Sequence, residues 1–127
     1  MIRFSLTARM GLTLCFLALL TLLSLIPGNP QPGDSAFMWL AAKTPRLVQK
    51  VLHVCFYGVL ALLFAWSLES VETRAYRFLI SLLIAVAFGA LMEWCQTKVP
   101  GRFGSAYDVA LDAAGAILGL TVAVVLF

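Results

Sequence analysis

Polar and ionisable side chains recur at helical spacing inside otherwise apolar stretches of this 127-residue chain. The candidates for one site are Lys50, His53, Tyr57, Glu93, Gln96, Arg102, Ser105, Asp108 and Asp112. His53 and Glu93 are the candidate catalytic pair, because imidazole and carboxyl groups serve as general acids and bases when their surroundings tune them. The remaining candidates would bind a ligand. No nucleophilic triad, HExxH motif or phosphate-binding loop occurs, so catalysis and simple binding both stay open.

The basic candidates indicate what kind of ligand would fit. Arginine matches phosphate with two parallel hydrogen bonds, whereas lysine supplies a compact charge. Arg102, Lys98 and Lys50 could therefore hold an anionic headgroup, and we predict a site for an anionic lipid or a lipid-linked envelope precursor. Lys50 and Arg102 could also face the acidic candidates as ion-pair partners.

The elements that carry these residues are membrane-spanning helices. The chain is 62% hydrophobic and 12% charged, and its mean hydropathy is +0.99. A helix needs about 20 mostly apolar residues to cross the hydrocarbon, and four segments qualify, at about 10–26, 48–68, 76–95 and 107–127. The sequence therefore predicts an all-α integral membrane bundle of four transmembrane helices, forming a single domain over residues 1–127.

An up-and-down bundle would gather the candidates on one side of the membrane. The start of the second helix, the end of the third and the start of the fourth all lie on that side. A charged side chain at the centre of a spanning helix costs about 2.5–3.5 kcal/mol, and His53 and Asp112 are too short to reach the headgroups. Such residues mark a functional site by default.

A second interpretation makes the same polar cluster a structural clasp between helices. Small residues that allow close helix packing support it, and they are Ala110, Ala113, Ala114, Gly115 and Gly119. A transporter or channel ranks last, because the other halves of the helices hold little beyond Ser67 and Ser81.

Other features exclude several function classes. The formal net charge of +3 is spread in ones and twos, so no nucleic-acid partner is predicted. Cys15, Cys55 and Cys95 lie in apolar stretches without a CxxC pair, so we predict no cofactor and no metal. The lipid bilayer is the expected partner, and a homo-oligomer is compatible with the sequence. The apolar stretch 36–42 could rest in the membrane interface.

Arg3 and Arg9 precede the first apolar segment and favour a cytoplasmic N-terminus. Ser24, Leu25 and Ile26 at its end lack the small-residue pattern of a signal cleavage site, so we predict a retained helix. Four spans then place both termini in the cytoplasm and the candidate site near the outer face.

The ordered motifs resemble the VanZ family of small bacterial membrane proteins. They comprise Lys50-x-x-His53-x-x-x-Tyr57, Glu93-Trp-Cys-Gln96, Pro100-Gly101-Arg102 and Ser105-x-x-Asp108-x-x-x-Asp112-x-x-Gly115-x-x-x-Gly119, over about two-thirds of the chain. The resemblance implies a multi-pass protein of the bacterial cytoplasmic membrane, in a family named for a protein associated with teicoplanin resistance. It supplies no reaction. The family commonly has Asn where this chain has Asp112, which adds an ionisable carboxyl to the site.

Overall fold

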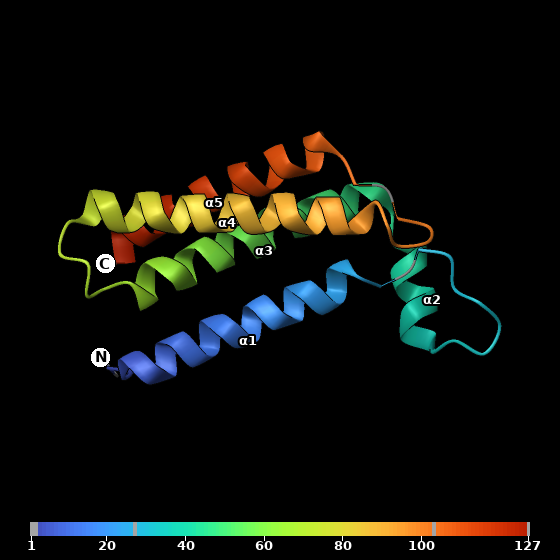
Figure 1. Cartoon of the computed structure of the whole chain (residues 1–127), viewed down its shortest axis with the longest axis horizontal. Coiled ribbons are helices and arrows are strands. Elements are labelled where there is room, and N and C mark those ends of the chain that lie inside the picture. The colour runs from blue at the N-terminus through green and yellow to red at the C-terminus, as the bar shows by residue number, and fades with distance from the viewer. Residues whose placement is uncertain (1–2, 27, 103, 127) are drawn as a thin grey trace.

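The computed structural model describes residues 3–26, 28–102 and 104–126, and in these residues the only regular structure is helical. The helices are α1 (Leu6–Ser24), α2 (Ala36–Lys43), α3 (Arg46–Ser67), α4 (Arg74–Gln96) and α5 (Ala106–Leu126) (Figure 1). All except α2 are long and apolar enough to cross a membrane. Their outward surface is rich in exposed leucine and valine, as lipid contact requires. The predicted all-α bundle with four spans is confirmed.

The helix ends differ from the predicted ones by one to four residues. The largest difference is at α1, which begins at Leu6 because the Ser5 hydroxyl accepts a hydrogen bond from the backbone N–H of Ala8 (3.1 Å). The proline expected to stop this helix, Pro27, lies outside the described residues, as does Phe127 at the end of the fourth predicted span.

Helices α3 and α5 approach each other through glycines. A Cβ atom added to Gly115 would lie 2.3 Å from the carbonyl oxygen of Val54, and one added to Gly119 would lie 2.0 Å from that of Gly58. The two glycines therefore form the predicted close-packing interface. The alanines were partly misassigned: Ala110 and Ala114 are exposed, and the fully buried alanines of α5 are Ala116 and Ala123.

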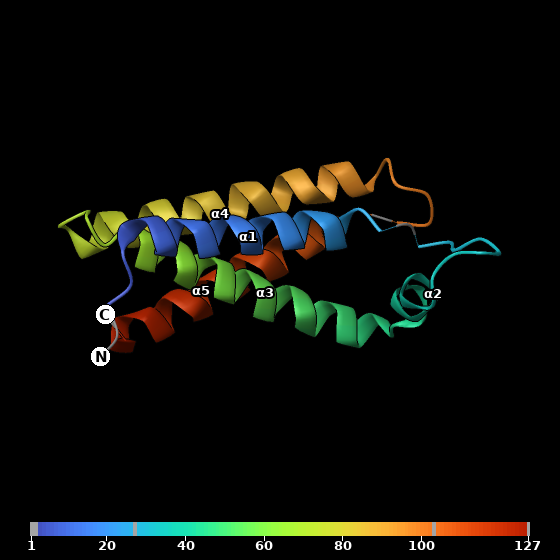
Figure 2. The same cartoon turned by 90° about the horizontal axis from the view of Figure 1, so that it is seen from below.

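Helix α1 packs beside α3 and is tied to it at the end of the bundle that holds both termini (Figures 1 and 2). The Thr13 and Ser67 hydroxyls are hydrogen-bonded at 2.7 Å, and both residues are buried. One turn nearer the N-terminus, Arg9 forms an ion pair with Glu69. These polar contacts give α1 a defined register against α3 inside an apolar surrounding.

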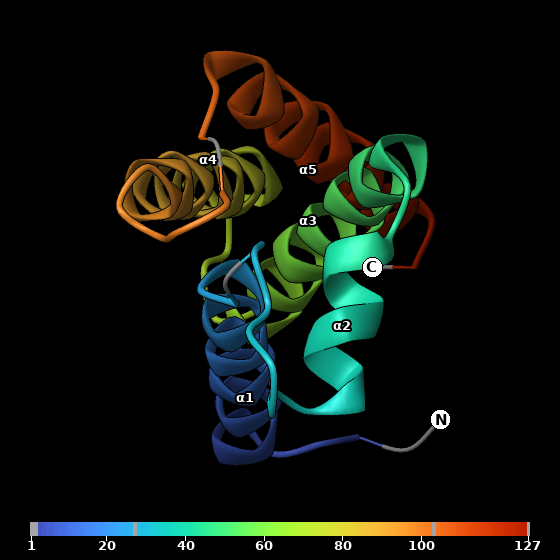
Figure 3. The same ribbon diagram turned by 90° about the vertical axis from the view of Figure 1, so that its right-hand side faces the viewer.

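The short helix α2 lies at the opposite end, across the direction of the long helices (Figures 1 and 3). It has no buried residue, and Phe37, Trp39 and Leu40 are all exposed. A short helix that exposes large apolar side chains at the end of a membrane bundle fits the predicted interfacial position. Its helical form was not predicted.

Candidate functional site

A contact between α3 and α5 forms the centre of the site. His53 Nδ1 lies 2.6 Å from Asp112 Oδ1, and the Asp112 side chain has 0% exposure. The close approach at Gly115, one turn further along α5, brings the two helices near enough for this bond. Helix α4 leaves room for it at Gly89, where a Cβ atom would lie 2.7 Å from Asp112 Oδ2. Tyr57 lies parallel to the His53 ring, with the ring planes 7° apart and the centroids 6.2 Å apart.

Glu93 is held from the loop between α4 and α5. Its Oε2 atom accepts a hydrogen bond from the backbone N–H of Ser105 (3.0 Å). A Cβ atom on Gly104 would lie 2.1 Å from the Glu93 carbonyl oxygen, so this loop folds closely over the end of α4. Glu93 is only 4% exposed, and its Oε1 atom has no hydrogen-bond partner among the described residues. One carboxylate oxygen is thus hydrogen-bonded, while the other is buried without a hydrogen-bond partner among the described residues.

Asp108 stands in the first turn of α5, where its backbone N–H donates to the Ser105 hydroxyl (3.2 Å). One ligand atom each from His53, Glu93 and Asp108 lie within 4.8 Å of one another. Imidazole nitrogen and carboxylate oxygen are both donors to divalent metals. These three residues are therefore the group in the described part of the chain that could hold a metal ion.

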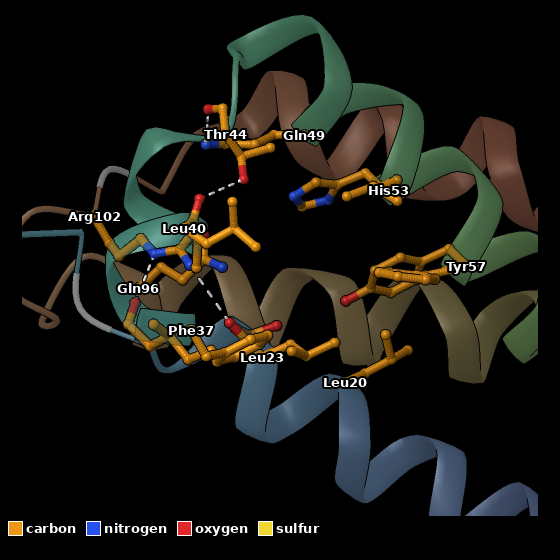
Figure 4. A pocket seen from close by; sticks show the side chains of 15 residues that line it. Leu20, Leu23, Phe37, Leu40, Thr44, Gln49, His53, Tyr57, Gln96 and Arg102 are labelled. Carbon is orange, nitrogen blue, oxygen red and sulfur yellow. Dashed lines mark hydrogen bonds between the residues drawn. The ribbon is translucent and has the colours of Figure 1, made fainter. Parts of the chain in front are cut away.

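Arg102 is bound to the end of α1. Its Nε atom donates to the carbonyl oxygen of Ile26 (2.7 Å), and its Nη2 atom is 3.5 Å from that of Leu23 (Figure 4). Carbonyls at a helix C-terminus lack intrahelical partners and carry partial negative charge, so a guanidinium group stabilises them. Partial burial lowers the pKa of Arg102, and the nearby negative charge of Glu93 opposes that shift. The side chain joins the α4–α5 loop to α1.

Two cavities adjoin at this end of the bundle. A polar one of about 480 Å³ is lined by residues including Arg46, Lys50, Arg102, Ser105, Tyr107 and Asp108. An apolar one of about 290 Å³ lies between α1, α2 and α3 and is lined by residues including Leu20, Leu23, Phe37, Leu40, Leu52 and Phe56 (Figure 4). Both cavities are lined by Ala41, Thr44, Gln49, His53, Gln96 and Arg102. The shared residues therefore connect a cavity lined by cationic side chains to one lined mainly by apolar surface.

The structure brings the nine predicted site residues to one end of the bundle, in different positions. The polar cavity is lined by Lys50, His53, Gln96, Arg102, Ser105 and Asp108. Tyr57 lines the apolar cavity, whereas Glu93 and Asp112 are buried and line neither. Lys98 does not join them: its Nζ atom lies 4.3 Å from the centroid of the exposed Trp94 ring.

The predicted partners of the acidic side chains were wrong. Lys50 and Arg102 could have formed ion pairs with Glu93, Asp108 and Asp112. Instead Lys50 Nζ lies over the Tyr107 ring at 4.8 Å, and Arg102 binds backbone carbonyls while interacting with Glu93 only electrostatically. Asp112 instead pairs with His53. Helical spacing shows which side chains share a face, but not how one helix is rotated against the next.

Several lining residues were missed by the sequence reasoning. Arg46 and Gln49 precede Lys50 and His53 by one helical turn, so a search for that spacing would have found both. Thr44 lies just before α3, and its carbonyl oxygen accepts a hydrogen bond from Gln49 Nε2 (3.0 Å). Tyr107 carried no signal, because its role depends on the position of Lys50 across the cavity.

Comparison with known proteins gives one family. No curated protein and no solved structure matches the chain significantly. The family described as VanZ/LLP1 matches residues 9–127, which includes α3, α4 and α5, all of α1 from Arg9 onward, and every residue of the site described above. The chain belongs to the VanZ/LLP1 family.

Proposed function

We propose that this VanZ-family membrane protein binds an anionic amphiphile, a phospholipid or a lipid-linked envelope precursor, at the end of the bundle opposite its termini. The observation that carries the proposal is the junction of the two cavities. An amphiphile has a charged headgroup and an apolar chain. The two adjoining cavities differ in the same way, because one is polar and the other is apolar. Their volumes, about 290 and 480 Å³, fall within or close to the range of about 300–1,000 Å³ found for small-molecule pockets.

The polar cavity has the charge that an anionic headgroup needs. Three cationic side chains line it, those of Arg46, Lys50 and Arg102, against the single carboxyl of Asp108. Because Arg102 already donates two hydrogen bonds to α1, we assign the main headgroup contacts to Arg46 and Lys50. The cavity lies at the end of the bundle and is lined partly by loop residues, so an anionic headgroup at the membrane surface could meet these cations.

The apolar cavity would hold part of the lipid chain. It is bounded on one side by α1, which is fixed to the rest of the bundle by the Thr13–Ser67 contact and by the bond from Arg102 to the Ile26 carbonyl oxygen just beyond its C-terminal end. Four leucines and two phenylalanines are among the residues that line it. A lipid chain there exchanges one apolar surrounding for another, so this cavity would determine where the chain lies more than it would add binding free energy.

A binding measurement with two-charge variants tests the headgroup assignment. The variant Arg46→Gln/Lys50→Gln, in nanodiscs of zwitterionic lipid, should lose about tenfold or more in affinity for added phosphatidylglycerol, because each charged hydrogen bond is worth about 1.5–3 kcal/mol. The control Lys43→Gln/Lys98→Gln removes the same charge from side chains that do not line the polar cavity. Equal loss in both variants would reject the cavity as the headgroup site.

A second pair of variants tests the chain-binding half. Leu52 lines the apolar cavity, whereas Val51 is exposed on the same helix and lines neither cavity. Leu52→Trp should weaken binding of phosphatidylglycerol and leave binding of its headgroup fragment, glycerol phosphate, unchanged. Val51→Trp should alter neither. If Leu52→Trp affects the two probes equally, the apolar cavity does not hold the chain.

The clasp remains the second candidate, and a specific observation favours it. Arg102 joins the α4–α5 loop to α1, and the His53–Asp112 bond joins α3 to α5. A protein without turnover could use such bonds to present its surface to an envelope partner. Teicoplanin susceptibility of a deletion strain that carries the Arg46→Gln/Lys50→Gln variant separates the two. If the cavity binds an amphiphile, the variant should fail to complement the deletion although its protein level and stability are normal. If the polar cluster is only a clasp, the variant should complement as well as the wild type.

A further inference from the structure

The ligand atoms of three residues converge beside the polar cavity. His53 comes from α3, Glu93 from the end of α4 and Asp108 from the start of α5, and one donor atom of each lies within 4.8 Å of the others. His53 and Asp108 line the cavity, and Glu93 is buried behind them. The three helices thus supply one nitrogen and two carboxylate donors at a single point.

Three carboxyl groups, those of Glu93, Asp108 and Asp112, surround one histidine. In the described part of the chain no lysine or arginine forms an ion pair with any of them, although Arg102 is close enough to Glu93 for an electrostatic interaction. Glu93 and Asp112 are 4% and 0% exposed. A buried carboxylate needs a partner or a bound metal to offset its lost hydration. The Oε1 atom of Glu93 and the Oδ2 atom of Asp112 are both buried, and neither has a hydrogen-bond partner among the described residues.

We propose that His53, Glu93 and Asp108 bind a divalent transition-metal cation of the Zn²⁺ type, with Asp112 orienting the imidazole. The bond between His53 Nδ1 and Asp112 leaves Nε2 as the ligand nitrogen. A hydrogen bond from the other ring nitrogen to a carboxylate is the usual support for a metal-bound histidine. This site stands on the chain's own donors and does not depend on lipid binding.

The distances between the three donor atoms require only a small movement of the side chains when an ion binds. Three atoms within 4.8 Å of one another leave an ion at a distance of roughly 2.8 Å or less from each, whereas bonds from Zn²⁺ to nitrogen and oxygen are about 2.0–2.2 Å. Half-buried His53 and Asp108 can close that difference by small changes in side-chain torsion. Three protein ligands leave a position for water or an anionic oxygen, and the polar cavity that His53 and Asp108 line is adjacent.

Titration of the metal alone tests the site. Metal-free protein in non-ionic detergent, without added lipid, should bind one equivalent of Zn²⁺ by calorimetry. Asp108→Asn and Glu93→Gln should each weaken binding by at least about tenfold, the lower bound seen for loss of even an orienting partner of a ligand. Asp34→Asn removes an acidic side chain from the loop before α2 at the same end, and it should change the affinity less than about twofold.

One substitution separates coordination from simple attraction of charge. Asp108→His removes the same negative charge as Asp108→Asn but supplies a ligand nitrogen, so it should retain most of the Zn²⁺ affinity. Equal weakening by Asp108→His and Asp108→Asn in folded protein would overturn the proposal, as would a wild-type protein that binds no Zn²⁺.

A spectroscopic measurement serves if these variants fail to fold. Co²⁺ in a low-coordinate nitrogen and oxygen site absorbs visible light far more strongly than hydrated Co²⁺. Wild-type protein should show that spectrum, and added Zn²⁺ should abolish it. A spectrum unchanged from hydrated Co²⁺ would also overturn the proposal. The lipid assay uses Arg46 and Lys50, neither of them a proposed ligand, so either proposal can fail without the other.

Discussion

Asp112 occupies a position where a single side chain joins two helices inside the membrane. Its Oδ1 atom accepts the bond from His53, and its Oδ2 atom is buried against Gly89. An asparagine there would keep the carbonyl oxygen that accepts the histidine proton and would remove the ionisable group. We therefore expect the bond to require an acceptor at this position rather than a negative charge.

We expect Asp112→Asn to be nearly as stable as the wild type, with a change of less than about 1 kcal/mol, because the hydrogen bond to His53 is retained. Asp112→Leu leaves His53 Nδ1 without its partner and should lower the free energy of unfolding by about 1–3 kcal/mol. Denaturant titration in detergent micelles followed by circular dichroism measures both. Equal destabilisation by the two substitutions would mean that the carboxylate charge, not the acceptor, matters.

The helices are positioned by contacts of two kinds. Glycines allow α3 and α5 to touch along their backbones, whereas polar bonds fix α1, at Thr13–Ser67 near the termini and at Arg102 near the site. The first kind determines the distance between His53 and Asp112. The second determines where α1 stands and hence the width of the apolar cavity.

The α3–α5 contact leads to a prediction at the level of the helix. Gly115→Leu should reduce the yield of folded protein and destabilise it by about 1–3 kcal/mol or more, because its Cβ atom alone would meet the Val54 carbonyl oxygen at 2.3 Å. Val125→Leu, on the same helix at a position 84% exposed, should leave both unchanged. Gel filtration in detergent and denaturant titration compare them. Equal yields and stabilities would show that α3 and α5 do not pack through Gly115.

At the scale of the whole molecule, both termini lie at one end of the bundle and the site lies at the other (Figure 1). Any orientation of the protein in a membrane therefore separates the site from the termini. A headgroup taken from one leaflet enters only if the site faces that leaflet. The sidedness of the bundle thus decides which lipids it can meet.

We predict cytoplasmic termini and a site at the outer face, because Arg3 and Arg9 precede the first span. The test replaces Cys15, Cys55 and Cys95 by alanine and adds single cysteines at exposed positions. Gln31→Cys, in the loop at the site end, should react with an impermeant maleimide on intact cells. Glu72→Cys, in the turn at the opposite end, should react only after the membrane is opened. The reverse pattern would invert the orientation.

The sequence by itself determined the four spans and the side of the bundle on which the polar residues gather. Hydropathy is a local property, and a spanning helix must satisfy its own backbone hydrogen bonds, so length and composition are enough to predict it. The alternation of up and down helices then placed His53, Glu93 and Asp108 at one end. The spacing of four residues between Gly115 and Gly119 also predicted close helix packing from the sequence alone.

Only the tertiary structure decided which side chains meet. Rotation of a helix about its axis depends on packing with its neighbours, so the sequence could not pair His53 with Asp112 or direct Arg102 to the end of α1. Both cavities likewise depend on how α1 and α2 lie against α3. The convergence of His53, Glu93 and Asp108 within 4.8 Å joins residues from three helices, up to 55 positions apart in the chain. No pattern in the local sequence indicates that these three donor atoms lie close together, because the packing of the helices decides it.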